Sequence, residues 1–135
     1  MPVIVFYKRF LILLFTIGGL FFSANANEPM QSALEQVYSA LKAGDAKALS
    51  RTFDTNLSLS IKKEEGVYTK FQAELLLQDF FRLNKVSELK EDQKVNNSSN
   101  NFVVYRLISG TSVYRVFVKF SQNNRSAQVV ELRIE

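Results

Sequence analysis

Apolar residues recur at intervals of three and four between Pro29 and Leu41, and this spacing predicts an amphipathic helix. Its apolar stripe consists of Met30, Ala33, Leu34, Val37 and Leu41. Pro29 suits the first helical position, where its missing N–H is not needed. Gly44 suits the C-terminal cap, and Asp45 can cap a second, short helix that reaches Phe53.

The next segment changes to a period of two, which is typical of a strand buried on one side. Apolar and polar residues alternate along Leu57, Ser58, Leu59, Ser60, Ile61 and Lys62. Turn-forming residues flank this stretch, at Asp54-Thr55-Asn56 and at Lys63-Glu64-Glu65-Gly66. We therefore expect one half-buried strand between two turns.

A third helix has the clearest start, because Thr69 and Gln72 have the spacing of a capping box. Asp79 and Arg82 lie on its polar side at a spacing that supports an ion pair. Its predicted apolar face consists of Ala73, Leu76, Leu77, Phe80 and Phe81. The two adjacent phenylalanines can reach two sides of a core, so packing explains them more readily than a ligand-binding role.

The rest of the chain predicts a meander of strands. Residues 86–95 indicate a short or edge strand, and residues 96–101 an exposed loop. Turns are expected at Gly110-Thr111, as a type II′ turn, and at Asn123-Asn124. The strands between them are expected to share one apolar face, made of Val103, Tyr105, Leu107, Tyr114, Val116, Val118, Phe120, Val130, Leu132 and Ile134.

The opposite face of these strands carries charges. A tight turn at Gly110-Thr111 places Arg106 opposite Arg115, which is unfavourable unless an acid lies between them. We expect Glu131 to lie within one pair of Arg115, so that these three residues and Arg133 form a charged cluster. A solvated surface with weak exposed ion pairs is the simpler interpretation. A site for an anionic partner is the alternative.

Helices come first in the chain, then a strand and a helix, then a run of antiparallel strands. This order predicts an α+β fold, with N-terminal helices packed on one side of an antiparallel sheet. The helix stripes at Leu34 and Leu76 are expected to bury against the sheet face that carries Tyr105, Val116 and Leu132.

Composition narrows the possible chemistry. The chain has no cysteine and no histidine, so it cannot build a structural zinc site or a nucleophile system based on either residue. The acidic pairs Glu64-Glu65 and Glu91-Asp92 lack the loop pattern of a calcium site. No phosphate-binding glycine loop or serine-nucleophile motif is present. We therefore predict neither a metal nor a cofactor.

Residues 1–26 have the layout of a secretory signal peptide. Lys8 and Arg9 precede an apolar run of about 13 residues, shorter than the roughly 18 that a membrane span needs. Ser23-Ala24-Asn25-Ala26 matches an A-x-A cleavage site. We expect cleavage near Ala26-Asn27, no membrane span afterwards, and export to the periplasm or exterior of a Gram-negative bacterium. The absence of disulfides favours a bacterial exported protein.

Residues 27–135 are long enough for one domain with one core. Without Lys8 and Arg9, the 17 basic residues fall to 15 against 13 acidic ones, a formal charge of +2. Nucleic-acid binding requires a strong basic patch, and a nearly balanced domain does not provide it. No nucleic-acid partner is predicted.

Three parts of the chain resemble one known family. They are Gly44-Asp45 with Phe53-Asp54 before a Leu-Ser-Leu-Ser-Ile strand, Tyr68-Thr69-Lys70-Phe71-Gln72-Ala73-Glu74 leading to Asp79-Phe80-Phe81, and Tyr114-Arg115-Val116 with Glu131-Leu132-Arg133-Ile134. Together they resemble an uncharacterised family of exported Bacteroidetes proteins with a nuclear transport factor 2-like (cystatin-like) fold, in which helices pack on a curved sheet. Family members often carry a histidine and a glycine after the Phe-Phe pair, and residues 88–92 here contain neither. The family has no agreed activity.

The wider superfamily resemblance implies a conical cavity between the helices and the sheet. In some members, such as ketosteroid isomerases, that cavity holds an aspartate base and a tyrosine donor. Here no carboxylate stands at a core-facing strand position, because Glu131 faces away and Asp54 lies at a predicted turn. The candidate cavity residues are Tyr38, Tyr68, Phe80, Phe81, Tyr105 and Tyr114.

Three functions remain open. The favoured one is an exported, non-catalytic binding or interaction module for an unknown small apolar ligand or a periplasmic protein partner. The second is a small-molecule isomerase or dehydratase that uses a cavity tyrosine. The third is a structural subunit that forms a homodimer through the outer sheet face.

Overall fold

The computed structural model describes residues 28–122 and 125–135. The predicted signal peptide and the predicted turn at Asn123-Asn124 lie outside these residues. Within them, the helices and strands are α2 (Glu28–Ala43), α3 (Ala46–Ser50), β1 (Phe53–Ile61), β2 (Glu64–Thr69), α4 (Lys70–Leu83), β3 (Glu88–Asn96), β4 (Asn101–Ser109), β5 (Ser112–Gln122) and β6 (Ala127–Ile134). None of these helices is long and apolar enough to cross a membrane.

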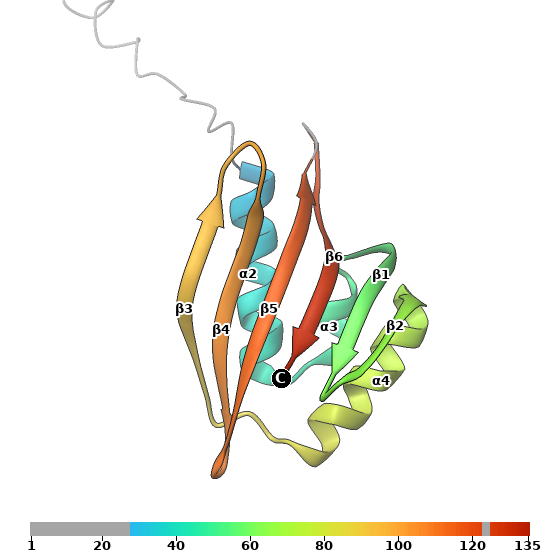
Figure 1. Cartoon of the computed structure of the whole chain (residues 1–135), viewed down its shortest axis with the longest axis vertical. Coiled ribbons are helices and arrows are strands. Elements are labelled where there is room, and N and C mark those ends of the chain that lie inside the picture. Colours follow the sequence, from blue (N-terminus) through green and yellow to red (C-terminus); the bar gives the residue numbers. More distant parts are fainter. Residues whose placement is uncertain (1–27, 123–124) are drawn as a thin grey trace, which may run out of the picture.

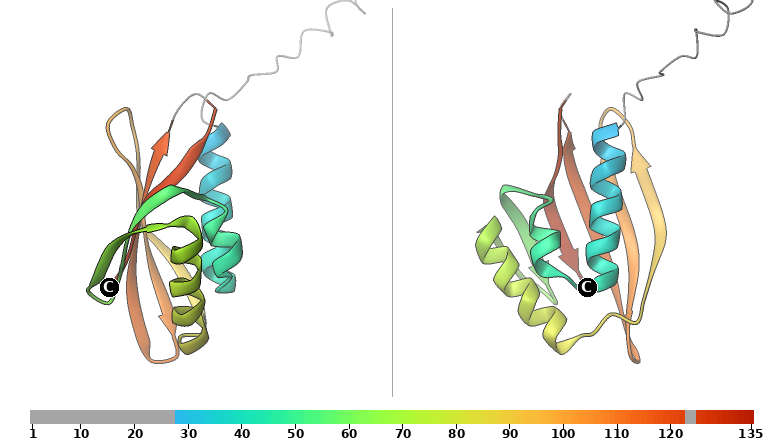
Figure 2. Two further views of the ribbon diagram at one scale, coloured as in Figure 1. Left: turned by 90° about the vertical axis from the view of Figure 1, so that its right-hand side faces the viewer. Right: turned by 180° about the vertical axis from the view of Figure 1, so that it is seen from behind.

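The strands form one curved sheet in the order β2-β1-β6-β5-β4-β3. Figure 1 looks onto the face of the sheet that the described helices leave open, and the right-hand view of Figure 2 shows the helices across the other face. We call the open face the outer face. The predicted α+β architecture, with helices on one side of the sheet, is confirmed. Neighbouring strands are antiparallel except β1 and β6, which run parallel.

The helix boundaries that rest on local signals are confirmed. Gly44 has a φ of +64° after α2, and the Asp45 carboxylate accepts a hydrogen bond of 3.0 Å from Ala48 N at the start of α3. Thr69 and Gln72 form both hydrogen bonds of the capping box. These contacts satisfy backbone groups that a helix end leaves open.

Sequence patterns misplaced the segments around β1. The second helix ends at Ser50 rather than Phe53, and Phe53 instead starts β1 opposite Val129 of β6. Asp54-Thr55-Asn56 is part of β1, not a turn. These three residues lie at an irregularity between two pairs with β6, Phe53–Val129 and Ser58–Glu131, and Asn56 pairs with Thr69 of β2. Pairing on both sides overrides the local turn preference.

The predicted turn at residues 63–66 is also wrong. The turn consists of Lys62 and Lys63, which have φ values of +50° and +76°, and the chain then continues into edge strand β2. Ile61 pairs with Glu64, so this is a two-residue hairpin with positive φ at both central positions, the pattern of a type I′ turn. Lysine is a poor residue for that conformation.

Replacing Lys63 with glycine is expected to stabilise the protein by about 1 kcal/mol, because glycine adopts positive φ without the steric cost of a Cβ atom. The Lys63 side chain is exposed, so little packing is lost. Urea denaturation followed by circular dichroism measures the change. Gly44→Ala is the converse control, and should lower the free energy of unfolding by a similar amount. A lower stability for Lys63→Gly would contradict the assigned turn.

The register of the C-terminal strands is largely as predicted. Ser109 pairs with Ser112, and Gly110 has the positive φ expected at the first central position of the turn. One assignment is wrong, because a β-bulge in β6 shifts the register between Lys119 and Phe120. Val129 rather than Val130 is therefore the core residue, with an exposed fraction of 0%.

The core lies between the inner face of the sheet and the helices. The α2 stripe packs there as predicted, with Leu34 partly buried at its margin. Leu76 does not bury against the sheet: its exposed fraction is 39%. The buried side of α4 consists of Ala73, Leu77, Phe80 and Phe81, so Leu76 falls beyond the edge of the apolar stripe.

Candidate functional site

The six predicted cavity residues occupy three separate places. Tyr38 of α2 and Tyr105 of β4 lie together, with ring centroids 6.1 Å apart. Tyr105 is buried and Tyr38 is 37% exposed. Tyr68 lies on β2, where its ring crosses Gly66 so closely that a Cβ atom there would come within 2.9 Å of Tyr68 Cζ. These tyrosines therefore do not converge on one point.

Phe80, Phe81 and Tyr114 form an aromatic cluster at the end of α4. Phe80 contacts Phe81 and Tyr114 edge-on, with centroid distances of 5.4 and 5.2 Å. The Tyr114 hydroxyl donates a hydrogen bond of 2.7 Å to Asn84 Oδ1, which fastens the end of α4 to β5. The Lys62 ammonium lies 5.9 Å from the Phe80 ring centroid and 5.4 Å from that of Tyr114.

The surroundings of Tyr105 are unsuited to acid–base chemistry near neutral pH. Burial raises the pKa of its hydroxyl far above the ordinary value, and the nearby charge of Glu91 raises it further. Glu91 is the carboxylate that sequence reasoning missed: it pairs with Tyr105 in the sheet register. It is exposed, so it lacks the desolvation that turns a carboxylate into a base of raised pKa. In the described part of the chain, the buried polar residues are Ser50, Thr52 and Ser60.

The acidic residues do not assemble into a metal site in the part of the chain that the structure describes: no group of three or more potential ligands comes together there. This includes Glu64, Glu65, Glu91 and Asp92. The first two lie on edge strand β2, and the other two on β3 at the opposite edge of the sheet.

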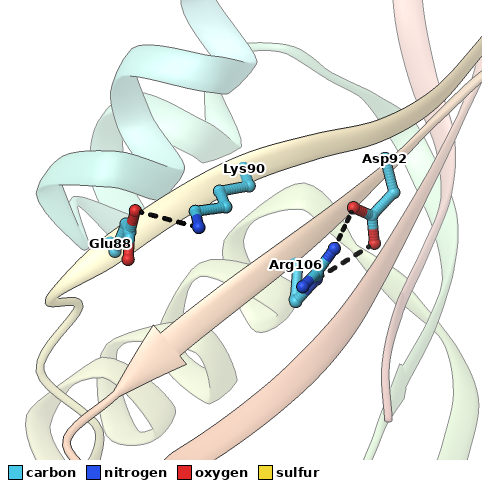
Figure 3. Close-up of polar contacts among 4 residues, drawn as sticks. All are labelled: Glu88, Lys90, Asp92 and Arg106. Atoms are coloured by element: carbon cyan, nitrogen blue, oxygen red, sulfur yellow. Dashed lines mark hydrogen bonds and ion pairs between the residues drawn. The ribbon is translucent and has the colours of Figure 1, made fainter.

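The outer face carries the predicted pair of opposed arginines. Arg106 of β4 lies opposite Arg115 of β5, and on its other side it pairs in register with Lys90 of β3. Three cations therefore stand in one row across three strands. Lys90 is 3.5 Å from Glu88, and a bidentate contact with Asp92 neutralises Arg106, at 2.7 and 3.3 Å (Figure 3).

Asp92 was not predicted as a member of this cluster. A register shift between Glu91 and Gln93 makes it the extra residue of a β-bulge in β3, and a bulge re-aims a side chain. The hydrogen bond from Arg106 holds the pKa of Asp92 below its ordinary value, and the same bond raises the pKa of Arg106. Both groups are solvated, so this pair adds little stability.

Glu131 does not lie near Arg115 as predicted. The β-bulge in β6 places it opposite Lys119, while Arg133 lies opposite Phe117. Arg133 is paired with Glu135 at 2.6 Å. The Arg115 side chain makes no hydrogen bond or ion pair with any described residue. Of the four predicted residues, Arg106 and Arg115 therefore lie together, and Glu131 and Arg133 lie on a neighbouring strand with other partners.

An apolar cluster on the outer face was missed altogether. Phe102 and Phe117 lie with their ring centroids 5.3 Å apart. Val104, two residues from Phe102 and opposite Phe117 in register, is only 3% exposed although it does not belong to the main core. We call Phe102, Val104 and Phe117 the outer cluster. Along β4 and β5, apolar residues occupy outward positions as well as inward ones such as Val103 and Val116. This run of apolar residues on both faces was the sequence signal that could have revealed the outer cluster.

Three open hollows on the helix side are lined entirely by described residues. The largest, about 590 Å³, lies between α2 and α3, and a smaller one of about 220 Å³ continues from it toward β6. The third lies between α3 and α4 and is lined in part by Phe81. No other predicted cavity residue lines these three hollows.

Comparison with known proteins gives a family and a fold. Residues 34–135 match the model of a domain of unknown function, DUF4783. No curated protein matches the chain. Solved DUF4783 structures from Bacteroides ovatus and Bacteroides uniformis are both 23% identical to it. The match to the Bacteroides ovatus structure covers 73% of this chain and 90% of that structure's chain, with a TM-score of 0.69. The match to the Bacteroides uniformis structure covers 75% of this chain and 94% of that structure's chain, with a TM-score of 0.70.

A more distant neighbour is an NTF2-like protein of unknown function from Cytophaga hutchinsonii. It is 7% identical, covers 78% of this chain and 87% of its own length, and has a TM-score of 0.56. At these identities the structural likeness establishes the fold alone. The fold is nuclear transport factor 2-like, as the sequence resemblance implied.

Proposed function

Since this chain belongs to the DUF4783 family, we propose that it is an exported, non-catalytic interaction module that associates with a second copy of itself through the outer sheet face. The observation that carries this proposal is the outer cluster. Large apolar side chains gather there. The described helices leave this face of the sheet open (Figure 1). Clusters of this kind, with aromatic residues at the centre and charges around them, are typical of protein interfaces.

The charges around the outer cluster favour a second copy as the partner. Strand β5 presents Arg115, Phe117 and Lys119 on the outer face, and its neighbour β6 presents Glu131, Arg133 and, beside Arg115, Glu135. Within one copy Arg133 pairs with Glu135 at 2.6 Å. A two-fold axis parallel to the strands, between β5 and β6, would place β5 of one copy over β6 of the other. Arg115 and Lys119 of each copy would then face Glu135 and Glu131 of the other copy. Phe117 would lie over Arg133 of the other copy, where a guanidinium can stack on the aromatic ring.

Charge reversal tests this arrangement. Lys119→Glu and Glu131→Lys should each weaken self-association at least about tenfold, because each puts like charges together twice in a two-fold interface. The double variant should restore most of the affinity. Sedimentation velocity on the protein purified from the periplasm of an expressing bacterium measures the association. Lys47→Glu, on α3 and away from the outer face, is the matched control.

Thermal denaturation of each variant shows whether the fold is intact, since Lys119 and Glu131 also face each other within one chain. A purely monomeric mass for the unmodified protein across the micromolar range contradicts self-association. Equal association by the unmodified protein, the two single variants and the double variant would place the contact elsewhere on the surface.

A further inference from the structure

The hollow between α2 and α3 has the volume of a ligand site and a mostly polar lining. Its volume of about 590 Å³ is within the range of roughly 300–1,000 Å³ that is usual for small-molecule pockets. Three alanines provide an apolar floor, and the polar lining residues are Ser32, Glu35, Gln36, Ser39, Asp45 and Arg51. The smaller hollow shares Ser32, Gln36 and Arg51, so the two form one groove along α2. We call it the α2–α3 groove.

Opposite charges line the α2–α3 groove: the cations are Arg51 and Arg125, and the carboxylates are Glu35 and Asp45. The Arg51 guanidinium makes no hydrogen bond or ion pair with any residue in the described part of the chain. The Glu35 carboxylate accepts a hydrogen bond of 3.2 Å from Gln31 on the solvent side. Asp45 uses one carboxylate oxygen to cap α3. Neither carboxylate is within the 4.0 Å of Arg51 that an ion pair requires.

This charge pattern selects the chemical class of the ligand. A simple anion would meet two carboxylates, and a simple cation would meet the two guanidinium groups. A neutral sugar would offer none of these charged groups an opposite charge. A zwitterion satisfies both signs at once, with its carboxylate on Arg51 and its ammonium toward Glu35 and Asp45.

From this geometry we infer that the α2–α3 groove binds a zwitterionic short peptide. The peptide carboxylate pairs with Arg51, where the two hollows meet, and its ammonium lies on the Glu35 side. The Gln36 amide and the Ser32 and Ser39 hydroxyls provide donors and acceptors for a peptide bond. The alanine floor accepts small apolar side chains. This site is on the helix side of the sheet and is independent of the outer face.

Nuclear magnetic resonance titration of the isotopically labelled full protein tests the inference. The probe is the dipeptide alanyl-alanine, compared with its N-acetylated form and its C-terminal amide. The free dipeptide should shift the amide signals of groove residues in a saturable way. Each blocked form should bind at least about tenfold more weakly, since each removes one charged contact.

Arg51→Gln and Glu35→Gln should weaken binding of the dipeptide by a similar factor, while Lys47→Gln on the outward side of α3 should not. Asp45 is left intact because its side chain caps α3. The inference is overturned if no groove signal shifts, if the blocked peptides bind as well as the free one, or if Arg51→Gln binds normally.

Discussion

Aspartate at position 129 is expected to prevent folding, whereas aspartate at position 130 is expected to leave the protein folded. Val129 is fully buried against Phe120 and Phe53 in the sheet register. A carboxylate there has neither water nor a partner, and the loss of roughly 5 kcal/mol is comparable with the whole stability of a small domain. Val130 is half-buried at the β-bulge, beside the position of Lys119, so its replacement should cost about 1 kcal/mol or less.

Circular dichroism and the soluble yield of the two variants measure the difference. Val130 and Val129 are neighbours of the same type, so each is the other's control for composition and β-propensity. If Val130→Asp unfolded the protein and Val129→Asp did not, the β-bulge would be misplaced by one residue. In that case Val130 would belong to the core, as simple alternation along the strand predicted.

Alanine at position 105 is expected to lower the free energy of unfolding by about 3–5 kcal/mol, since it deletes a large, fully buried ring. Phenylalanine at the same position keeps the ring and should cost about 1 kcal/mol or less. This contrast separates the packing role of Tyr105 from any chemical role of its hydroxyl. Urea denaturation near neutral pH measures both variants.

The two aromatic forms should differ at high pH. Burial raises the pKa of Tyr105 in the folded protein above the value of about 10 that holds in the unfolded chain. The contribution of the protonated Tyr105 to the free energy of unfolding is therefore complete below pH 10. It is lost as the pH rises through the raised pKa of the folded protein, because the unfolded chain releases the tyrosine proton at a lower pH. Tyr105→Phe should unfold at a higher pH than the unmodified protein. An identical alkaline transition would mean that Tyr105 is solvated.

Local signals in the sequence were sufficient for the helices. The Thr69–Gln72 capping box, the Asp45 cap and Gly44 each depend on contacts between residues at most five apart, and all three are present. The Arg106–Arg115 pairing followed in the same way, because a two-residue turn fixes the register of the two strands it joins. Each of these features is determined by interactions between residues close together in the sequence.

The remaining features depend on distant partners, so no local pattern reveals them. Asp54 looks like a turn residue, and only the pairs of Phe53 and Ser58 with β6 on either side of it hold it in a strand. Each β-bulge inserts one residue into an otherwise regular alternation. The bulge in β3 points Asp92 toward Arg106, and the bulge in β6 makes Val129 rather than Val130 the core residue. The outer cluster and the α2–α3 groove bring together residues from separate elements. The sequence therefore placed Arg106, Arg115, Glu131 and Arg133 on one sheet face, but not with their observed neighbours, and it missed Asp92 and the outer cluster.

The position of β6 in the sheet determines when the two parts of the sheet can join during folding. It lies between β5 and β1, and it joins the β1–β2 hairpin to the β3–β4–β5 meander (Figure 1). A nascent chain that has not yet produced Ala127–Ile134 therefore has two separate pieces of sheet, each with an uncovered edge. Contacts this far apart in sequence form slowly. Completion of the sheet consequently waits for β6, and chains in which β6 is missing or not yet paired are the species most exposed to aggregation and proteolysis.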